Sequence, residues 1–102
     1  MKPIGTHNYF VYITTNYAKT TLYIGVTNNL KTRLHQHQQN IDGSETFTGK
    51  YHSYNLVYFE RFEFIEHSIK REKEIKKWRR EKKNNLIASF NPEWKFLNNE
   101  IE

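Results

Sequence analysis

Two short runs of β-branched and aromatic residues near the start of the chain constrain the fold most. Residues 9–15 (YFVYITT) and 22–26 (LYIGV) have the composition of β-strands, and residues 16–19 between them are typical of a turn. The pair predicts an antiparallel hairpin, so a sheet is the first part of the fold.

The segments that follow predict helices and a third strand. Thr27 or Asn28 can cap the first helix, and Pro92 ends the last one, because the residue before a proline avoids helical geometry. The expected elements after the hairpin are a helix over 29–39, a surface loop over 40–54, a strand over 56–62, a long helix from 64 to about 82 and a short helix over 83–89. This order predicts an α+β fold, in which helices pack on a three-stranded antiparallel sheet.

Length and composition favour one compact, aromatic-rich domain. The chain has 102 residues, of which 36% are apolar and 16% aromatic, and it contains no cysteine. We expect a single domain over residues 1–102 whose ends, 1–8 and 98–102, are loose. The lack of cysteine excludes a disulfide framework and a thiolate metal site, and the longest apolar run, residues 9–13, is too short to cross a membrane. We therefore expect a cytoplasmic protein with no membrane partner.

The net charge of +5 is concentrated in one segment. Residues 66–83 hold nine Lys and Arg against four Glu, whereas the acidic and basic residues of the remaining chain balance. A basic segment of this kind predicts a polyanionic partner, whose phosphates it contacts without reading sequence. The alternative is a solvated helix face with no binding role.

Two polar side chains fall on the face of the first helix that should be buried. At about 100° per residue, Leu30 and Leu34 mark the inner face. Arg33 and His37 lie within the same arc. Burying a guanidinium or an imidazole without partners is costly, so these positions need either partners or a function.

The long basic helix shows the same pattern. Ile65, Ile69 and Ile75 mark its inner side, and Glu72 points between the second and the third of them. One explanation is a buried ion pair between Glu72 and Arg33 that joins the two helices. The other is a pocket in which the arginine, the histidine and the glutamate meet tyrosines of the hairpin.

The motifs in this order resemble those of the GIY-YIG nuclease superfamily. The resemblance extends from residue 9 to residue 97 and rests on Val11-Tyr12-Ile13, Tyr23-Ile24-Gly25, Arg33 with His37, and Glu72. Strings over residues 23–28, 47–48, 50–51, 71–78 and 91–94 are similar to those of small single-domain bacterial members, which resemble the N-terminal domain of the C component of excinuclease ABC. Val11 stands where the family name has glycine, but the tyrosine is kept, so we do not expect this change to inactivate the site.

The resemblance implies a metal-dependent endonuclease that hydrolyses DNA phosphodiester bonds in DNA repair or processing. It implies one Mg²⁺ or Mn²⁺ ion bound by Glu72, and no small-molecule cofactor. The residues that match the family's catalytic positions are Tyr12, Tyr23, Arg33, His37, Glu72 and Asn91. His37 matches a histidine present in some branches, and Asn91 matches an asparagine that follows the long helix in several members.

Two residues can serve as the general base. Tyr12 would act as a phenolate, which needs a pKa about three units below its usual value of ~10, whereas His37 needs no such shift. Gly25 fits a place where the backbone passes close to the substrate or a helix, or it is a simple end-of-strand glycine. Residues expected to contact nucleic acid are Lys50, Tyr51, Lys73, Lys76, Lys77 and Arg80.

Two alternative functions belong to other classes of protein. A nucleic-acid-binding module could keep the nuclease fold and cut poorly or not at all. An adaptor could instead dock the basic helix on an acidic protein. Metal-dependent nicking separates the nuclease from the module, and salt-sensitive DNA binding separates both from the adaptor.

Overall fold

A three-stranded antiparallel sheet forms the centre of the fold. The computed structural model describes residues 8–39 and 53–101. The strands are β1 (Tyr9–Thr15), β2 (Leu22–Thr27) and β3 (Asn55–Phe62), and β1 lies between the other two in the order β2-β1-β3. β1 pairs antiparallel with both neighbours, which confirms the predicted hairpin and the predicted α+β class.

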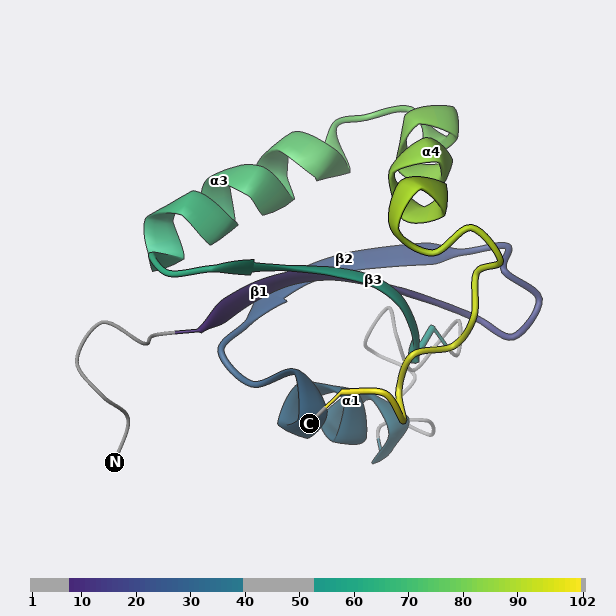
Figure 1. Cartoon of the computed structure of the whole chain (residues 1–102), viewed down its shortest axis with the longest axis horizontal. Helices are drawn as coiled ribbons and strands as arrows, with labels where there is room; N and C mark the ends of the chain where they lie inside the picture. The colour runs from purple at the N-terminus through teal and green to yellow at the C-terminus, as the bar shows by residue number, and fades with distance from the viewer. Residues whose placement is uncertain (1–7, 40–52, 102) are drawn as a thin grey trace.

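Helices cover both faces of the sheet (Figure 1). α1 (Leu30–Gln39) lies on one face, and α3 (Ile65–Lys76) and α4 (Arg80–Phe90) lie on the other. None of the helices in the described ranges has the length and apolar character that a bilayer span requires.

The alternation of side chains along β1 produces two cores, one on each face of the sheet. The core under α3 and α4 consists of Val11, Ile13, Ile24, Val57, Tyr58, Ile75 and Ile87. The core under α1 consists of Tyr12, Leu30, Leu34 and Leu56. Tyr12 therefore lies on the α1 face, whereas Val11 and Ile13 belong to the core on the other face.

The expected long basic helix is in fact two helices. α3 ends at Lys76 and α4 begins at Arg80, so α4 also starts earlier than the short helix predicted there. The amide N–H of Trp78 donates to the carbonyl of Ile75 at 3.0 Å, which closes the last turn of α3. Neither glycine nor proline occurs at residues 77–79, so the sequence carries no local signal for the break.

The inner face of α3 also differs from the prediction. Ser68 and Ile75 are buried, whereas Ile65 and Ile69 are exposed. The hydroxyl of Ser68 donates to the carbonyl of Ile65 at 2.7 Å, so this polar side chain is satisfied within the helix and can face the sheet. Glu72 consequently lies on a flank of the buried stripe and not between two buried isoleucines.

The C-terminal segment runs back along β3. The N–H of Leu97 donates to the carbonyl of Leu56 at 2.7 Å. The side chain of Asn98 accepts from the N–H of Leu56 at 2.8 Å and donates to the carbonyl of Tyr54 at 2.9 Å. Ile101 packs against the core under α1. Asn98 and Ile101 are thus anchored, where the sequence led us to expect a loose end.

Candidate active site

Tyr12 extends over β2, which is an edge strand of the sheet. Tyr12 and Gly25 are direct partners in the β1–β2 register, and Tyr12 is fully buried. A Cβ atom added to Gly25 would lie 2.5 Å from the hydroxyl oxygen of Tyr12 and 2.7 Å from its Cζ, closer than non-bonded atoms can approach. The sequence suggested that the backbone at Gly25 passes close to the substrate or to a helix. The backbone does pass close to another group, but that group is the ring of Tyr12.

Tyr12, Tyr23 and His37 form one aromatic cluster at this edge. The hydroxyl oxygen of Tyr12 and Nε2 of His37 are 3.0 Å apart, a hydrogen bond that joins β1 to α1. The ring centroid of Tyr23, on β2, lies 6.1 Å from that of Tyr12 and 5.3 Å from that of His37. The structure thus brings together three side chains that are far apart in the sequence.

α1 places Arg33 and His37 one turn apart on its inner side. Asn29 caps the helix by accepting a hydrogen bond in the first turn, and Leu34 is buried against the sheet. His37 is buried and Arg33 half-buried, as the helical wheel predicts. The positive charge of Arg33 acts on both His37 and Tyr12.

Burial sets the protonation states of the two hydrogen-bonded groups. Burial, and secondarily the charge of Arg33, lowers the pKa of His37 to about 4. Burial also raises the pKa of Tyr12 above its usual value, with further contributions from Tyr23 and Glu72 that outweigh the opposing charge of Arg33. At neutral pH the histidine is neutral and the tyrosine is protonated. The phenolate considered for Tyr12 needs a pKa shift in the opposite direction to the one that burial produces.

The lowered pKa of His37 predicts a specific loss of stability in acid. The unfolded chain binds a proton at the usual histidine pKa of about 6.5, whereas the folded chain resists protonation down to a pKa of about 4. Unfolding free energy should therefore fall between pH 6.5 and pH 4, by roughly 3 kcal/mol for this one group. We expect a His37→Gln variant to lack this component. Urea unfolding of both proteins at several pH values measures it, and parallel pH curves would contradict the prediction.

Glu72, on α3, acts on Tyr12 through its charge. Its charge contributes to the raised pKa of Tyr12, and its side chain is 19% exposed. One carboxylate oxygen lies 3.4 Å from Nζ of Lys76, one helical turn further along. Among the described residues the ion-pair partner of Glu72 is Lys76, so the alternative of a pair between Glu72 and Arg33 is not formed.

A single carboxylate at this position fits a metal ion that takes few protein ligands. Within residues 8–39 and 53–101, no three His, Cys, Asp or Glu side chains come together as a ligand set. Mg²⁺ is commonly held by one or two carboxylates together with waters and substrate phosphates. Glu72 fits that mode. The same surroundings do not fit a zinc site, which requires three or four nitrogen, sulfur or carboxylate ligands.

The side chain of Asn91, at the end of α4, forms hydrogen bonds with backbone groups. Its Nδ2 donates to the carbonyls of Val57 at 3.0 Å and Lys95 at 2.8 Å. Its Oδ1 accepts from the N–H of Lys95 at 3.0 Å, across a turn in which Trp94 has a φ of 54°. Both amide donors are therefore occupied. Asn91 holds this turn against β3, and its contacts give no support to the expected catalytic role.

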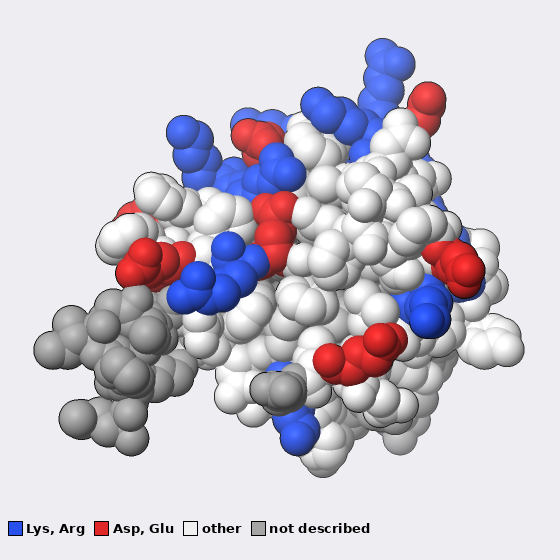
Figure 2. Space-filling view, viewed as in Figure 1, with Lys and Arg blue, Asp and Glu red and all other residues white. Residues whose placement is uncertain are grey.

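Basic side chains gather over α3 and α4, along the upper part of Figure 2. Lys73, Lys76 and Lys77 are exposed there, where they can meet phosphates. Two other residues expected to contact nucleic acid, Lys50 and Tyr51, lie outside the described residues.

Two polar contacts were not anticipated from the sequence. The guanidinium of Arg80 donates to the carbonyls of Thr20 at 2.8 Å and Lys19 at 3.0 Å, so it ties α4 to the β1–β2 turn. This leaves Arg80 less free to bind nucleic acid than we expected. The pair of Glu72 with Lys76 was also missed, although the spacing of four residues is a recognisable signal for it.

Tyr12, Tyr23 and His37 meet at one edge of a short antiparallel sheet, and the charges of Arg33 and Glu72 act on Tyr12. The family of GIY-YIG catalytic domains matches residues 8–85 of the chain. The chain therefore belongs to the GIY-YIG nuclease superfamily, as its motifs led us to expect. Members of this superfamily are generally endonucleases and usually use a divalent metal ion.

A curated relative supports the same assignment. The UPF0213 protein of Limosilactobacillus reuteri (strain DSM 20016) is 31% identical to this chain over 81 residues. The matched region covers 70% of this chain and 83% of that protein. No solved structure gives a significant match.

Proposed function

We propose that this chain, acting as a single domain, is a metal-dependent endonuclease that hydrolyses phosphodiester bonds in DNA during repair or processing. The observation that carries the proposal is the 3.0 Å hydrogen bond between Tyr12 and His37, at a sheet edge that the charges of Arg33 and Glu72 also reach. A proton-accepting pair beside a cation and a carboxylate provides what phosphodiester hydrolysis requires. Membership of the superfamily supports DNA as the substrate.

The pair of Tyr12 and His37 takes the proton from the attacking water. Because His37 is neutral at neutral pH, its Nε2 can accept a hydrogen bond from the Tyr12 hydroxyl. The Tyr12 oxygen then accepts a proton from water while its own proton passes to Nε2. This relay needs no free phenolate, which the raised pKa of Tyr12 disfavours. It requires the ring hydrogen of His37 on Nδ1, and the ¹⁵N chemical shifts of the imidazole report that tautomer.

Arg33 binds a non-bridging oxygen of the phosphate that is cleaved. Its guanidinium forms charge-assisted hydrogen bonds to phosphate. A bound phosphodiester also offsets the positive charge that helps to lower the pKa of His37. Substrate binding therefore makes His37 a stronger base at the stage when a proton has to move.

Glu72 would hold one Mg²⁺ or Mn²⁺ ion, with waters and a phosphate oxygen as the other ligands. When bound, such an ion supplies positive charge that polarises the phosphate and stabilises the leaving oxygen. Before a metal ion binds, the carboxylate of Glu72 is paired with the ammonium group of Lys76. Lys73 and Lys77 contact flanking phosphates, which gives affinity that does not depend on base sequence.

The test is a cleavage assay on plasmid and on duplex, nicked, flapped and branched DNA, with Mg²⁺, Mn²⁺ or EDTA. We expect cleavage of at least one substrate with a divalent ion and none with EDTA, since Arg33 alone cannot offset the charge of the transition state. Salt-sensitive DNA binding without cleavage under any condition would contradict the proposal in favour of a binding module. Absence of salt-sensitive binding would instead favour an adaptor.

A further inference from the structure

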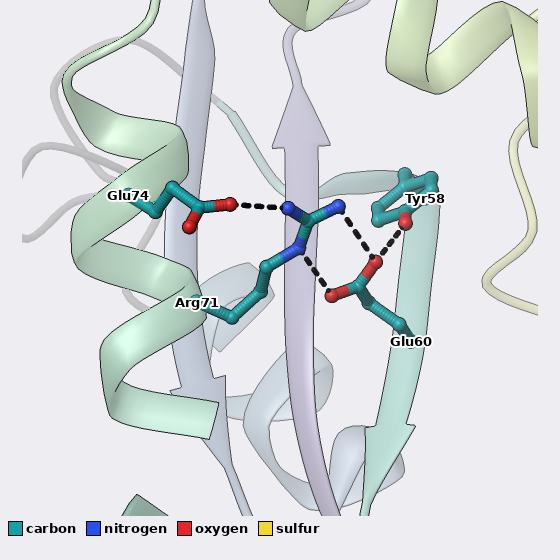
Figure 3. Close-up of polar contacts among 4 residues, drawn as sticks. All are labelled: Tyr58, Glu60, Arg71 and Glu74. Carbon is teal, nitrogen blue, oxygen red and sulfur yellow. Dashed lines mark hydrogen bonds and ion pairs between the residues drawn. The ribbon is translucent and has the colours of Figure 1, made fainter. Parts of the chain in front are cut away.

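Arg71 connects α3 to the far edge strand of the sheet. Its Nε donates to Oε1 of Glu60 at 2.8 Å, and its Nη2 lies 3.5 Å from Oε2 of the same carboxylate. Its Nη1 donates to Glu74 at 2.5 Å, and the hydroxyl of Tyr58 donates to Glu60. Figure 3 shows the Arg71 side chain extending from α3 across β1 to Glu60 on β3. One guanidinium thus bridges a helix and a strand.

The bridge is held from several sides. The side chains of Arg71 and Glu60 are only 26% and 22% exposed, so solvent screens this pair less than the pair with Glu74, whose side chain is 48% exposed. The guanidinium also lies 5.1 Å from the centroid of the Trp78 ring, which restricts it further.

Arg71 and Glu72 are neighbours in sequence but point to opposite flanks of α3. The buried stripe of this helix consists of Ser68 and Ile75. At about 100° per residue, Arg71 falls on one side of that stripe and Glu72 on the other. Arg71 reaches β3, at one edge of the sheet, while Glu72 lies on the flank away from it. Any rotation of α3 about its axis therefore moves both side chains together.

The apolar contacts of α3 leave this rotation weakly defined. Its buried stripe offers the sheet one small serine and one isoleucine, Ser68 and Ile75, because Ile65 and Ile69 are exposed. The small side chain of serine makes few packing contacts that would oppose a rotation of α3. A bidentate arginine–carboxylate contact fixes both the distance and the direction between the helix and the strand. The contact of Arg71 with Glu60 thus adds a directional restraint on the angle of α3 to the restraint given by Ile75.

We propose that Arg71, anchored by Glu60, is a positioning residue that holds Glu72 at the edge where Tyr12 and His37 lie. This inference rests on the proposed function, in which Glu72 holds the metal ion. A shift of about 1 Å in a catalytic group is enough to cost much of its effect, so an anchor on the opposite flank of the helix matters to the reaction.

The test measures Mn²⁺ binding directly in the full-length protein. Paramagnetic broadening of backbone amide signals near Glu72 gives the dissociation constant in a titration with Mn²⁺ alone, without any cleavage. The variants are Arg71→Gln and Glu60→Gln, with Glu74→Gln as the matched control. Glu74 also contacts Arg71, and its substitution changes the charge as Glu60→Gln does. Circular dichroism checks that each variant is folded.

Charge and position predict different patterns across these variants. If Arg71 acted only through its charge, its removal would tighten Mn²⁺ binding, and loss of the Glu60 charge would weaken it. If Arg71 acts by positioning Glu72, Arg71→Gln and Glu60→Gln should each raise the dissociation constant for Mn²⁺ by about tenfold. The double variant Arg71→Gln/Glu60→Gln should bind Mn²⁺ no more weakly than either single variant. Glu74→Gln should stay within about twofold of the wild type. Tighter binding in Arg71→Gln, or equal effects of Glu60→Gln and Glu74→Gln, would overturn the proposal.

A Glu72→Ala titration separates failure of this proposal from failure of the proposed function. If Mn²⁺ binding survives in Glu72→Ala, the metal site itself is wrong. If binding is lost there but Arg71→Gln and Glu60→Gln bind as the wild type does, only the positioning role fails. Should Arg71→Gln not fold, Arg71→Lys serves in its place. It keeps the charge but cannot make the two-pronged contact, so positioning predicts weaker binding and wild-type binding would refute it.

Discussion

The Glu72→Ala variant should cleave DNA about a thousandfold more slowly than the wild-type protein at the same Mg²⁺ concentration. A bound metal ion contributes several kcal/mol to a phosphoryl-transfer transition state, and about 4 kcal/mol corresponds to three powers of ten in rate. The fold should survive, because Glu72 lies on a flank of α3 and its ion pair is with the exposed Lys76. Initial rates of cleavage of the best substrate measure the effect.

A second acidic residue of α3 provides the control for this experiment. Glu66 is exposed in the first turn of the helix, and Glu66→Ala removes the same charge from the same element. Its cleavage rate should remain within about twofold of the wild type. Equal rates in Glu72→Ala and the wild type would mean that the activity comes from a contaminant or that another carboxylate holds the ion.

Local patterns were sufficient to predict the sheet and the first helix. Alternation along β1 explains why Tyr12 and its neighbours belong to different cores, and the buried positions of α1 follow from a period of 3.6 residues. In both cases one apolar face packs on the sheet, so the periodicity of the sequence and the burial in the fold coincide. The sequence therefore predicted that Arg33 and His37 lie on the inner side of α1, but it left the contact of His37 with Tyr12 as one of two alternatives.

The same reasoning failed for α3 because its apolar residues do not mark its buried side. Isoleucines at 65 and 69 are exposed, and Ser68, which the pattern counts as polar, is buried. The end of the helix was also misplaced. Trp78 packs against the core, and the cations of Arg71 and Lys82 lie 5.1 Å and 4.2 Å from its ring centroid. The packing of Trp78 on a core formed largely by the strands is a tertiary contact, so no local propensity reports it.

The chemical state of the site could not be predicted from the sequence either. The motif residues indicated which groups meet, but the direction of each pKa shift depends on how deeply the group is buried. Tyr12 is enclosed between the sheet and α1, and the cost of burying a phenolate exceeds the help that Arg33 gives. A tyrosine that stays protonated changes the proposed chemistry from a phenolate base to a relay with His37.

Adding a single methyl group at Gly25 should reduce cleavage about a hundredfold, close to the effect of Tyr12→Phe. The new Cβ of Gly25→Ala would lie 2.5 Å from the Tyr12 hydroxyl oxygen, so the ring has to move away from Nε2 of His37. A proton relay of this type contributes about 10²–10⁴-fold to rate. Because Tyr12 is fully buried, the displacement should also cost about 1–3 kcal/mol of unfolding free energy.

A neighbouring substitution separates the loss of activity from the loss of stability. Val26 packs against the core on the other face of β2, so Val26→Ala should destabilise the protein while leaving Tyr12 in place. We expect Val26→Ala to cleave at nearly the wild-type rate at a temperature where it is fully folded. The double variant Tyr12→Phe/Gly25→Ala should cleave no more slowly than either single variant, because both remove the same proton transfer. If Gly25→Ala cleaves as the wild type does, the reaction does not depend on the Tyr12 hydroxyl at its present place, and the relay through His37 is wrong.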